Sequence, residues 1–383
     1  MFIGLLYNKS YLYDKIINVY INVYLWVCLF LRYIMKSTQN IKVVDLFCGI
    51  GGLTHGLLQS GLEVVAGFDF DKSCQYAYEI NNNAKFFHKD IREVTPDEIN
   101  ELFGDAKYKV LVGCAPCQPF SNHSNKLKKS AENDARWNLL NEFLRLIKDV
   151  KPDFISMENV PQLMKIDIFK NFVAELKALD YHVNYSLVFC PDYGLPQSRR
   201  RLVLVASKHG EIKLLPKQYS KENYRTVKDA IGRLEPLKFG EVSLKDPLHK
   251  CSSLNEINYA RILASKPNGT WRDWDQSLLP ECYKKDSGQS FSAVYGRMAW
   301  DKPSPTITTQ FFSYGTGRFG HPEQHRALSL REGAILQGFP VGYKFTNGEE
   351  VSIKTISRHI GNAVPVTLGK VVGDSIKNHL VRI

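Results

Sequence analysis

The chain has 383 residues, of which 44% are hydrophobic and 23% are charged, a composition that is ordinary for a soluble globular protein and excludes a disordered or fibrous chain. Lys and Arg outnumber Asp and Glu by 50 to 39, and the formal net charge of +11 is compatible with a polyanionic partner without requiring one. The length leaves room for one large domain with a smaller one, or for two domains of ordinary size.

Residues 1–34 differ from the rest of the chain. Their apolar run from Val19 to Leu31 is shorter than the ~18 residues that a transmembrane helix usually needs, and no small-residue cleavage site follows Leu31. Met35 stands just before the first strand-like segment. We therefore expect translation to begin at Met35, and residues 1–34 to be a non-native or unstructured extension without a stable membrane partner. A genuine membrane anchor is the alternative.

From Ile41 onward, strand-like and helix-like segments alternate. This alternation predicts a doubly wound α/β domain, in which helices cover both faces of a sheet. Buried strands are predicted over 41–47, over 62–69, from Phe154 and over 201–207, and helices over 53–61 and 139–147.

The alternation is lost between about residues 207 and 295, where charges are mixed, aromatic residues are dispersed and periodicity is weak. We interpret this stretch as a smaller, irregular domain inserted into the first. Helix-like segments over 327–339 and 363–380 then predict a return to the α/β domain. The predicted divisions are 1–34, 35–206, 207–295 and 296–383.

The segment DLFCGIGGLTHG, residues 45–56, places glycines between a strand and a helix, where they allow a sharp turn and the close approach of a ligand. Asp69 ends the next strand, and an acidic side chain there can accept hydrogen bonds from ribose hydroxyls. Together these features indicate an adenosine-containing cofactor, and a tight turn without a ligand is the alternative. The spacing is not G-x-G-x-x-G, so a dinucleotide is disfavoured.

The segment GCAPCQPFS, residues 113–121, carries two cysteines with C-x-x-C spacing. This spacing alone is compatible with a redox pair, with half of a zinc site, or with the housing of one nucleophilic thiol. No second C-x-x-C completes a four-thiolate zinc site, and we expect no metal. The eight cysteines are otherwise scattered, which favours free thiols in a reducing cytoplasm.

The segments DLFCGIGG, PCQPFS, ENV, QSRRR, RMAWDKPSPTITT and IGNAVP follow one another in this order. Together they resemble the motif series of the bacterial DNA cytosine-5 methyltransferases, which use S-adenosylmethionine. The resemblance covers about residues 41–206 and 296–375. It implies a mixed sheet of the S-adenosylmethionine-dependent methyltransferase type, and methyl transfer to carbon 5 of cytosine within a specific short sequence of double-stranded DNA.

The chemistry explains why this series needs particular side chains. Carbon 5 of cytosine is a poor nucleophile until a thiolate adds to carbon 6. By resemblance Cys117 is that nucleophile, whereas Cys114 stands where the family commonly carries a small or apolar residue. Glu158 matches the glutamate that supplies a proton or hydrogen bond to ring nitrogen 3. Arg199 and Arg201 match two arginines that help to hold the base, and the arginine between them is expected to face solvent.

Other positions match the cofactor pocket of the family. The resemblance implies that the glycine loop contacts the methionine part, that Asp69 binds the ribose, and that an aromatic ring packs on the adenine. The family usually has Glu at position 69, and Asp is shorter but keeps the acceptor oxygens. The matched residues are Phe47, Gly49, Ile50, Gly51, Asp69, Phe70, Asp90, Ile91, Asn362 and Val364.

The remaining segments are expected to serve DNA binding. Residues 121–138 resemble the loop that closes over a flipped-out base. Residues 207–295 fall where the family keeps its target-recognition domain, and Arg261, Arg272 and Arg297 are candidates for guanine contacts. We expect a monomer that protects host DNA from a cognate restriction endonuclease acting separately.

Three alternatives stay open. A transfer-RNA cytosine-5 methyltransferase has a similar catalytic core, and the sizeable insert favours DNA over it. A nicotinamide or flavin oxidoreductase would explain the glycine turn but not the PCQ, ENV and QSRRR segments. A catalytically silent DNA-binding relative is disfavoured because Cys117, Glu158 and Arg199 are intact.

Overall fold

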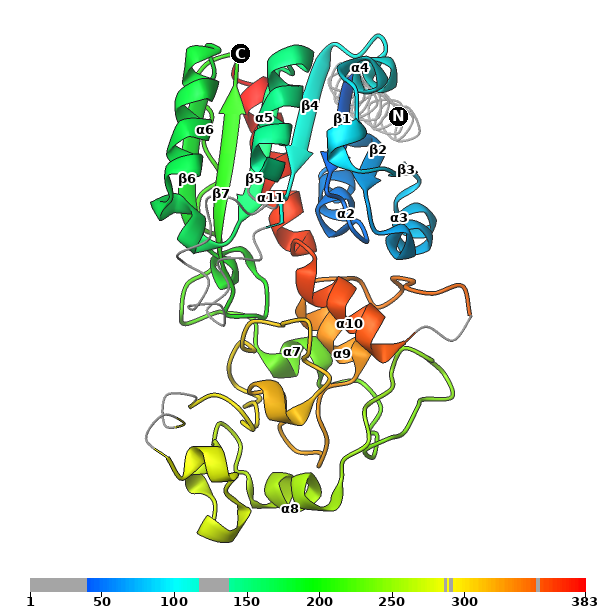
Figure 1. Ribbon diagram of the computed structural model, residues 1–383, viewed down its shortest axis with the longest axis vertical. Coiled ribbons are helices and arrows are strands. Elements are labelled where there is room, and N and C mark those ends of the chain that lie inside the picture. The colour runs from blue at the N-terminus through cyan, green and yellow to red at the C-terminus, as the bar shows by residue number, and fades with distance from the viewer. Residues whose placement is uncertain (1–39, 117–137, 286–287, 289–291, 349–351) are drawn as a thin grey trace, which may run out of the picture.

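A computed structural model describes residues 40–116, 138–285, 288, 292–348 and 352–383 of the chain. The upper half is built around a β-sheet, and the lower half consists of short helices and loops (Figure 1). Among the residues described, no helix is both long and apolar enough to cross a membrane. The predictions for residues 1–34 lie outside the described part of the chain.

The upper half contains a seven-stranded mixed sheet with the strand order β3-β2-β1-β4-β5-β7-β6. Strand β7 runs antiparallel to its neighbours β5 and β6, whereas the other pairs are parallel. The four strands predicted from the sequence are confirmed as β1, β2, β5 and β7. The bounds are β1 Ile41–Leu46, β2 Glu63–Asp69, β3 Lys85–His88, β4 Tyr108–Gly113, β5 Phe154–Asn159, β6 His182–Phe189 and β7 Arg200–Ser207.

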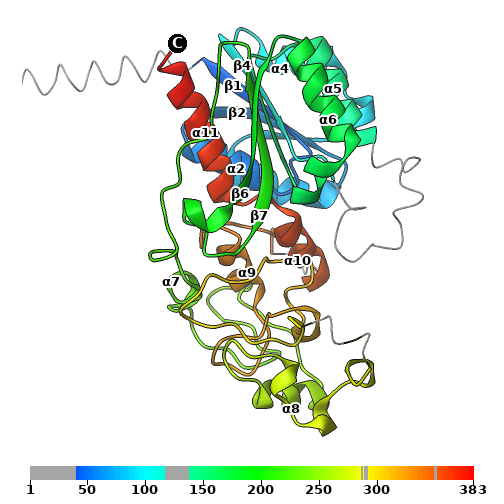
Figure 2. The ribbon, with the colours of Figure 1, turned by 90° about the vertical axis from the view of Figure 1, so that its left-hand side faces the viewer.

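Apolar side chains alternate between the two faces of the sheet. Each face carries its own helices (Figure 2). On β4, Val110 and Val112 belong to one core, and Leu111 between them belongs to the other. Helices α2, α3 and α11 cover the first face, and α4, α5 and α6 cover the second. The predicted doubly wound fold is therefore confirmed. The bounds are α2 Gly52–Gln59, α3 Gln75–Asn82, α4 Pro96–Phe103, α5 Asn138–Val150, α6 Asp167–Ala178 and α11 Val366–Leu380.

The lower half contains four further α-helices among the described residues, and it has a small core of its own that includes Trp271 and Trp274. Helices α9 and α10 lie here, and α11 then returns to the sheet (Figure 1). The predicted domain limits at 206/207 and 295/296 stay a prediction. The bounds are α7 Val227–Ile231, α8 Glu256–Ala264, α9 Leu330–Leu336 and α10 Ile353–Asn362.

Short 3-10 helices occur in both halves. They span Lys72–Cys74, Ile91–Glu93, Pro161–Lys165, Cys190–Tyr193, Trp271–Asp273, Gln276–Leu278, Glu281–Tyr283 and Tyr314–Thr316.

One expectation for the lower half is wrong. Arg297, predicted as a candidate for reading guanine, is buried and donates hydrogen bonds to the backbone carbonyls of Ile262 at 2.7 Å, Ser265 at 3.1 Å and His321 at 2.8 Å. Its guanidinium joins the C-terminal end of α8 to the loop at His321 within the lower half, because buried carbonyls need donors. The suggestions for the other two arginines stay predictions.

Candidate active site

The loop between β1 and α2 carries three residues with a positive φ angle: Phe47 at 59°, Gly49 at 51° and Gly51 at 82°. Glycine adopts this left-handed conformation readily, whereas for a phenylalanine it costs about 1–2 kcal/mol. Gly51 also has no room for a side chain, because a Cβ would lie 2.4 Å from Nδ2 of Asn82. The loop is thus held in one strained shape, and such strain is concentrated at functional sites.

Asp69, at the end of β2, fastens this loop to the neighbouring strand. Its Oδ2 accepts a hydrogen bond of 2.8 Å from the backbone N–H of Gly49, and its Oδ1 accepts one of 2.9 Å from the N–H of Asp71. Burial raises the pKa of Asp69 above its ordinary value, and the two backbone hydrogen bonds oppose that shift. Each carboxylate oxygen has a second lone pair, so Asp69 can still accept a hydrogen bond from a ligand.

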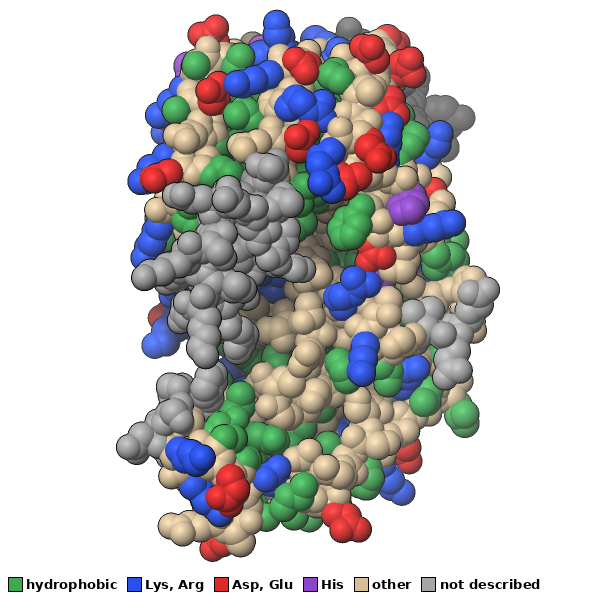
Figure 3. Space-filling view, viewed as in Figure 1, with side chains coloured by type: hydrophobic (Ala, Val, Ile, Leu, Met, Phe, Trp, Pro, Cys, Tyr) green, Lys and Arg blue, Asp and Glu red, His purple; other side chains and the backbone are tan. Residues whose placement is uncertain are grey.

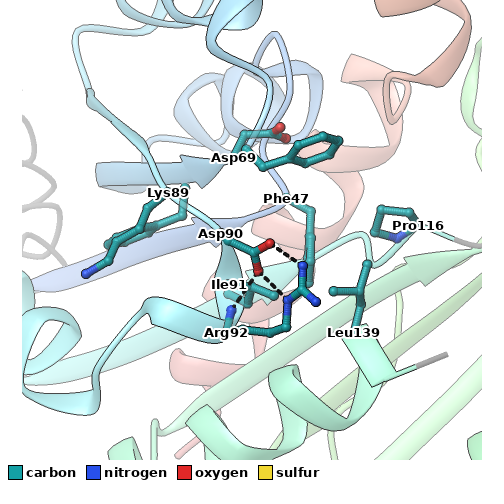
Figure 4. A pocket seen from close by; sticks show the side chains of 10 residues that line it. Phe47, Asp69, Lys89, Asp90, Ile91, Arg92, Pro116 and Leu139 are labelled. Carbon is teal, nitrogen blue, oxygen red and sulfur yellow. Dashed lines mark hydrogen bonds and ion pairs between the residues drawn. The ribbon is translucent and has the colours of Figure 1, made fainter. Parts of the chain in front are cut away.

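A pocket opens beside this loop, at the carboxyl end of the sheet, which is where ligands bind in open α/β sheets. It encloses about 540 Å³ of space that no atom fills, including the solvent in its open mouth. Figure 4 shows Asp90 and Arg92 on one side, Pro116 and Leu139 on the other, and Phe47 between them. The lining residues are Phe47, Phe68, Asp69, Phe70, Lys89, Asp90, Ile91, Arg92, Pro116 and Leu139.

Several residues predicted as cofactor contacts come together here, namely Phe47, Asp69, Phe70, Asp90 and Ile91. Phe70 is 67% exposed although it is a large apolar side chain. An exposed aromatic ring at the edge of a pocket offers a flat surface on which a heterocyclic ligand can pack. The arrangement therefore combines an acceptor for hydroxyl groups with a ring for stacking.

The other predicted cofactor residues are not among those that line the pocket. The carbonyl of Ile50 accepts a hydrogen bond from the Tyr343 hydroxyl. The carbonyl of Val364 lies so close to α2 that a Cβ on Gly52 would approach it to 2.3 Å. Their contact with a cofactor stays a prediction. This group consists of Gly49, Ile50, Gly51, Asn362 and Val364.

Arg92 is a lining residue that sequence reasoning missed. Its Nε and Nη2 lie 2.9 and 2.5 Å from Oδ1 and Oδ2 of Asp90, and these hydrogen bonds lower the pKa of Asp90. Asp90 is therefore ionised and already paired beside the pocket. The sequence shows only that Arg92 follows Asp90 by two positions, and this spacing does not indicate that either side chain lines a pocket.

Glu158, near the end of β5, is the centre of a second group of side chains. Its Oε2 accepts a hydrogen bond of 2.9 Å from the thiol of Cys114, and Nε of Arg201 on β7 forms an ion pair with Oε1 at 2.8 Å. Glu158 is buried, and Oε1 accepts no hydrogen bond from the described residues. Arg201 thus approaches Oε1 without the alignment of a hydrogen bond, and a buried oxygen in this state can still hydrogen-bond to a ligand.

Arg199, just before β7, is also buried. Its Nη1 donates to the carbonyl of Ile307 at 3.1 Å and its Nη2 to that of Gly361 at 3.3 Å, while its Nε meets no acceptor among the described residues. Burial lowers the pKa of Arg199 to about 9, and the positive charge of Arg201 acts in the same direction. Arg199 thus stays charged at neutral pH. The arginine between the two is exposed, as the alternation of side chains predicts.

The predicted nucleophile Cys117 and nearly all of the predicted loop 121–138 lie outside the described residues. The residues before Cys117 nevertheless connect the two groups of side chains. Cys114 contacts Glu158, and Pro116 lines the pocket that Asp69 also lines. The role of Cys117 stays a prediction.

Asp71, Cys74 and His359 form a group, within the described part of the chain, that could hold a metal ion, because their ligand atoms lie within 4.8 Å of one another. Asp71 is paired with Arg358 at 2.9 Å, and Nε2 of His359 lies 3.0 Å from the hydroxyl of Ser73. The charge of Arg358 opposes a cation at this place. We interpret the group as a polar network that joins α10 to the turn after β2. The expectation that the protein binds no metal stays a prediction.

The chain is similar to known proteins along most of its length. The model of a family described as C-5 cytosine-specific DNA methylase matches residues 41–378. The type II methylase M.HgiDII of Herpetosiphon aurantiacus is 53% identical over 341 residues, which cover 88% of this chain and 95% of the relative. The type II methyltransferase M1.HphI of Haemophilus parahaemolyticus is 29% identical over 377 residues, which cover 96% of each chain.

Solved structures show the same fold at lower identity. A protein described as a prophage-encoded DNA modification methyltransferase of E. coli has a TM-score of 0.69 at 22% identity, covering 89% of this chain and 99% of that one. A DNMT2 variant of Spodoptera frugiperda has a TM-score of 0.58 at 20% identity, with the same coverage. At these identities the two structures support the fold alone.

Proposed function

Since this chain belongs to the C-5 cytosine-specific DNA methylases and is thus a DNA cytosine-5 methyltransferase, we propose that it modifies one short double-stranded sequence and protects it from a cognate restriction endonuclease. The observation that carries the proposal is the link between the two groups of side chains, in which Pro116 lines the pocket of Asp69 and Cys114 contacts Glu158. We further propose that it acts as a monomer in the cytoplasm, where the DNA of a bacterium lies.

S-adenosylmethionine is the cofactor proposed for the pocket, and its sulfonium would supply the methyl group. The residues present fit it. The carboxylate of Asp69 can accept hydrogen bonds from ribose hydroxyls, and the exposed ring of Phe70 can pack on the adenine. The backbone of the glycine loop, held by Asp69, lets the remainder of the molecule approach closely.

The second group of side chains is proposed to act on the base. The thiolate of Cys117 adds to carbon 6 of cytosine, so that carbon 5 forms the new bond to the methyl group. Loss of the proton from carbon 5 and departure of the thiolate then restore the aromatic ring. The carboxyl group of Glu158 donates a proton or a hydrogen bond to ring nitrogen 3 as charge develops there, and Arg199 and Arg201 supply positive charge beside it.

Access to the base requires that the cytosine leave the duplex, because an enzyme's nucleophile cannot reach a ring that is stacked between its neighbours. On the face shown in Figure 3, Lys and Arg side chains are spread over both halves, with acidic side chains among them. Such scattered cations suit contacts with a phosphate backbone on both sides of the site. Residues 207–295 are proposed to recognise the sequence.

Bisulfite sequencing tests the proposal directly. DNA is isolated from a methylation-deficient bacterial host that expresses the chain, and from a host that expresses the Cys117→Ala variant. We expect protected cytosines within a single short motif, and none with the variant. Soluble protein that binds S-adenosylmethionine but protects no cytosine in DNA would contradict the proposal. Transfer RNA from the same cells is then examined for 5-methylcytosine.

A further inference from the structure

Glu158 receives one hydrogen bond from the described residues, and its donor is the thiol of Cys114 at 2.9 Å. We propose that Cys114 is a positioning residue for Glu158. Its thiol engages Oε2 of the carboxyl group, so that Oε1 is the oxygen that meets the target base. This inference rests on the proposed function, because it concerns the carboxylate that acts on the cytosine. Cys114 itself needs no contact with the substrate.

The backbone around Cys114 is held firmly enough to give the thiol a defined place. The N–H of Cys114 donates to the carbonyl of Leu46 at 3.3 Å, which continues the pairing of β4 with β1. On the other side, β4 pairs with β5 so that Gly113 lies opposite Met157, one residue before Glu158. Nδ2 of Asn159 then donates to the carbonyl of Ala115 at 3.0 Å. Cys114 is thus fixed from both sides.

The two oxygens of Glu158 have different surroundings. Oε2 is occupied by the thiol, whereas Oε1 lies 2.8 Å from Nε of Arg201 without accepting a hydrogen bond from the described residues. An arginine and a carboxylate prefer two parallel hydrogen bonds, a geometry that would occupy both oxygens. With Oε2 engaged by the thiol, the ion pair that is observed joins Arg201 to Oε1 alone, and this contact is not aligned as a hydrogen bond. The positive charges facing the carboxylate come from Arg201 on the adjacent strand β7 and from Arg199 just before it.

A pair of substitutions that differ by one hydroxyl group tests the inference. Cys114→Ser keeps a donor at this position and Cys114→Ala removes it, while both side chains are small. For the full chain we expect the alanine variant to lower kcat for DNA methylation by about three- to tenfold, the effect of one hydrogen bond. The serine variant should stay within about twofold of the parent. KM for S-adenosylmethionine should be unchanged in both, because Cys114 does not line that pocket.

Equal kcat values for the alanine and serine variants would overturn the inference, whether they equal the parent value or fall below it, because the donor would then be irrelevant. A change confined to KM would overturn it as well. Cys114→Gly provides a second variant without a donor should the alanine variant fail to fold. A parent protein that methylates no DNA would instead contradict the proposed function, and the inference would fall with it.

Discussion

The carboxylate of Asp69 lies 2.8 Å from the backbone N–H of Gly49, so that a single hydrogen bond joins the end of β2 to the loop after β1. The same carboxylate faces the proposed cofactor pocket. The shape of the loop and the affinity for the cofactor are therefore coupled through one side chain. Substitutions at two neighbouring residues, Asp69 and Phe70, can distinguish an effect on the stability of the loop from an effect on cofactor affinity.

Replacing Asp69 by Ala should reduce both stability and cofactor affinity. Two backbone N–H groups lose their acceptor, which should lower the free energy of unfolding by about 1–3 kcal/mol. Binding of S-adenosylmethionine, measured by calorimetry, should weaken by at least about tenfold. Phe70→Ala is the matched control, because its exposed ring should contribute to binding but change stability by only about 0.5 kcal/mol or less. Unaltered binding by the Asp69 variant would contradict the assignment.

Arg201 and Arg200 provide a second matched pair. Arg201→Ala leaves the buried carboxylate of Glu158 without its ion pair, and we expect kcat for methyl transfer to fall about a hundredfold. Arg200 is exposed and lies over the ring of Phe189, so Arg200→Ala should keep kcat within about twofold at saturating DNA. Single-turnover assays measure both values. Equal losses in the two variants would show that charge alone, and not the pairing with Glu158, matters.

The crossing of α2 and α11 depends on Gly56. A Cβ at this position would lie 2.2 Å from the carbonyl of Val366 and 2.5 Å from the N–H nitrogen of Lys370. Gly→Ala in a helix usually gains about 1 kcal/mol, but here the sign should reverse to a loss of about 1–3 kcal/mol in the free energy of unfolding. Gly342→Ala is the control, because nothing lies within 4 Å of its Cβ. Urea denaturation measures both, and a stabilised Gly56→Ala protein would refute the packing described.

Acid should destabilise the protein in two steps through a buried cluster in the lower half. Burial lowers the pKa of His321 from 6.5 to about 4. For Glu332, burial alone would raise the pKa, but hydrogen bonds from Arg326 and its charge outweigh burial and lower the pKa from 4.5 to about 2. Both groups bind protons more readily in the unfolded chain, so each contributes stability at neutral pH that is lost as the pH falls.

The first loss should occur between about pH 6.5 and 4 and belong to His321, and the second between about pH 4.5 and 2 and belong to Glu332. The free energy of unfolding, measured by urea titration at a series of pH values, reports both. Glu332→Gln should flatten the curve only below about pH 4.5. A His321→Gln protein that still loses the same stability between pH 6.5 and 4 would show that another group is responsible.

Some features of the site could be predicted because they depend on neighbours in the sequence. The alternation of apolar residues predicted β1 and β2, and the glycines between β1 and α2 indicated the turn whose φ angles are positive. Asp69 ends a predicted strand, so its place at the carboxyl edge of the sheet follows from the strand itself. The roles of Glu158, Arg199 and Arg201 came from a resemblance to a family, and the structure brings these three together.

Other features needed contacts between distant residues. Cys114 and Glu158 are 44 positions apart, and their hydrogen bond exists because β4 and β5 pair in one particular register. Arg297 looked like a DNA contact by its charge, but its burial is decided by segments up to 35 residues away.

By itself, the sequence determined the alternating α/β pattern, the glycine turn after β1 and the acidic end of β2, because periodicity and turn chemistry act over a few residues. Only the tertiary structure decided that Arg92, Pro116 and Leu139 share a pocket with Asp69, and that a thiol rather than Arg201 holds Oε2 of Glu158. Strand register and helix packing place these side chains, and both depend on the burial of the whole apolar surface at once.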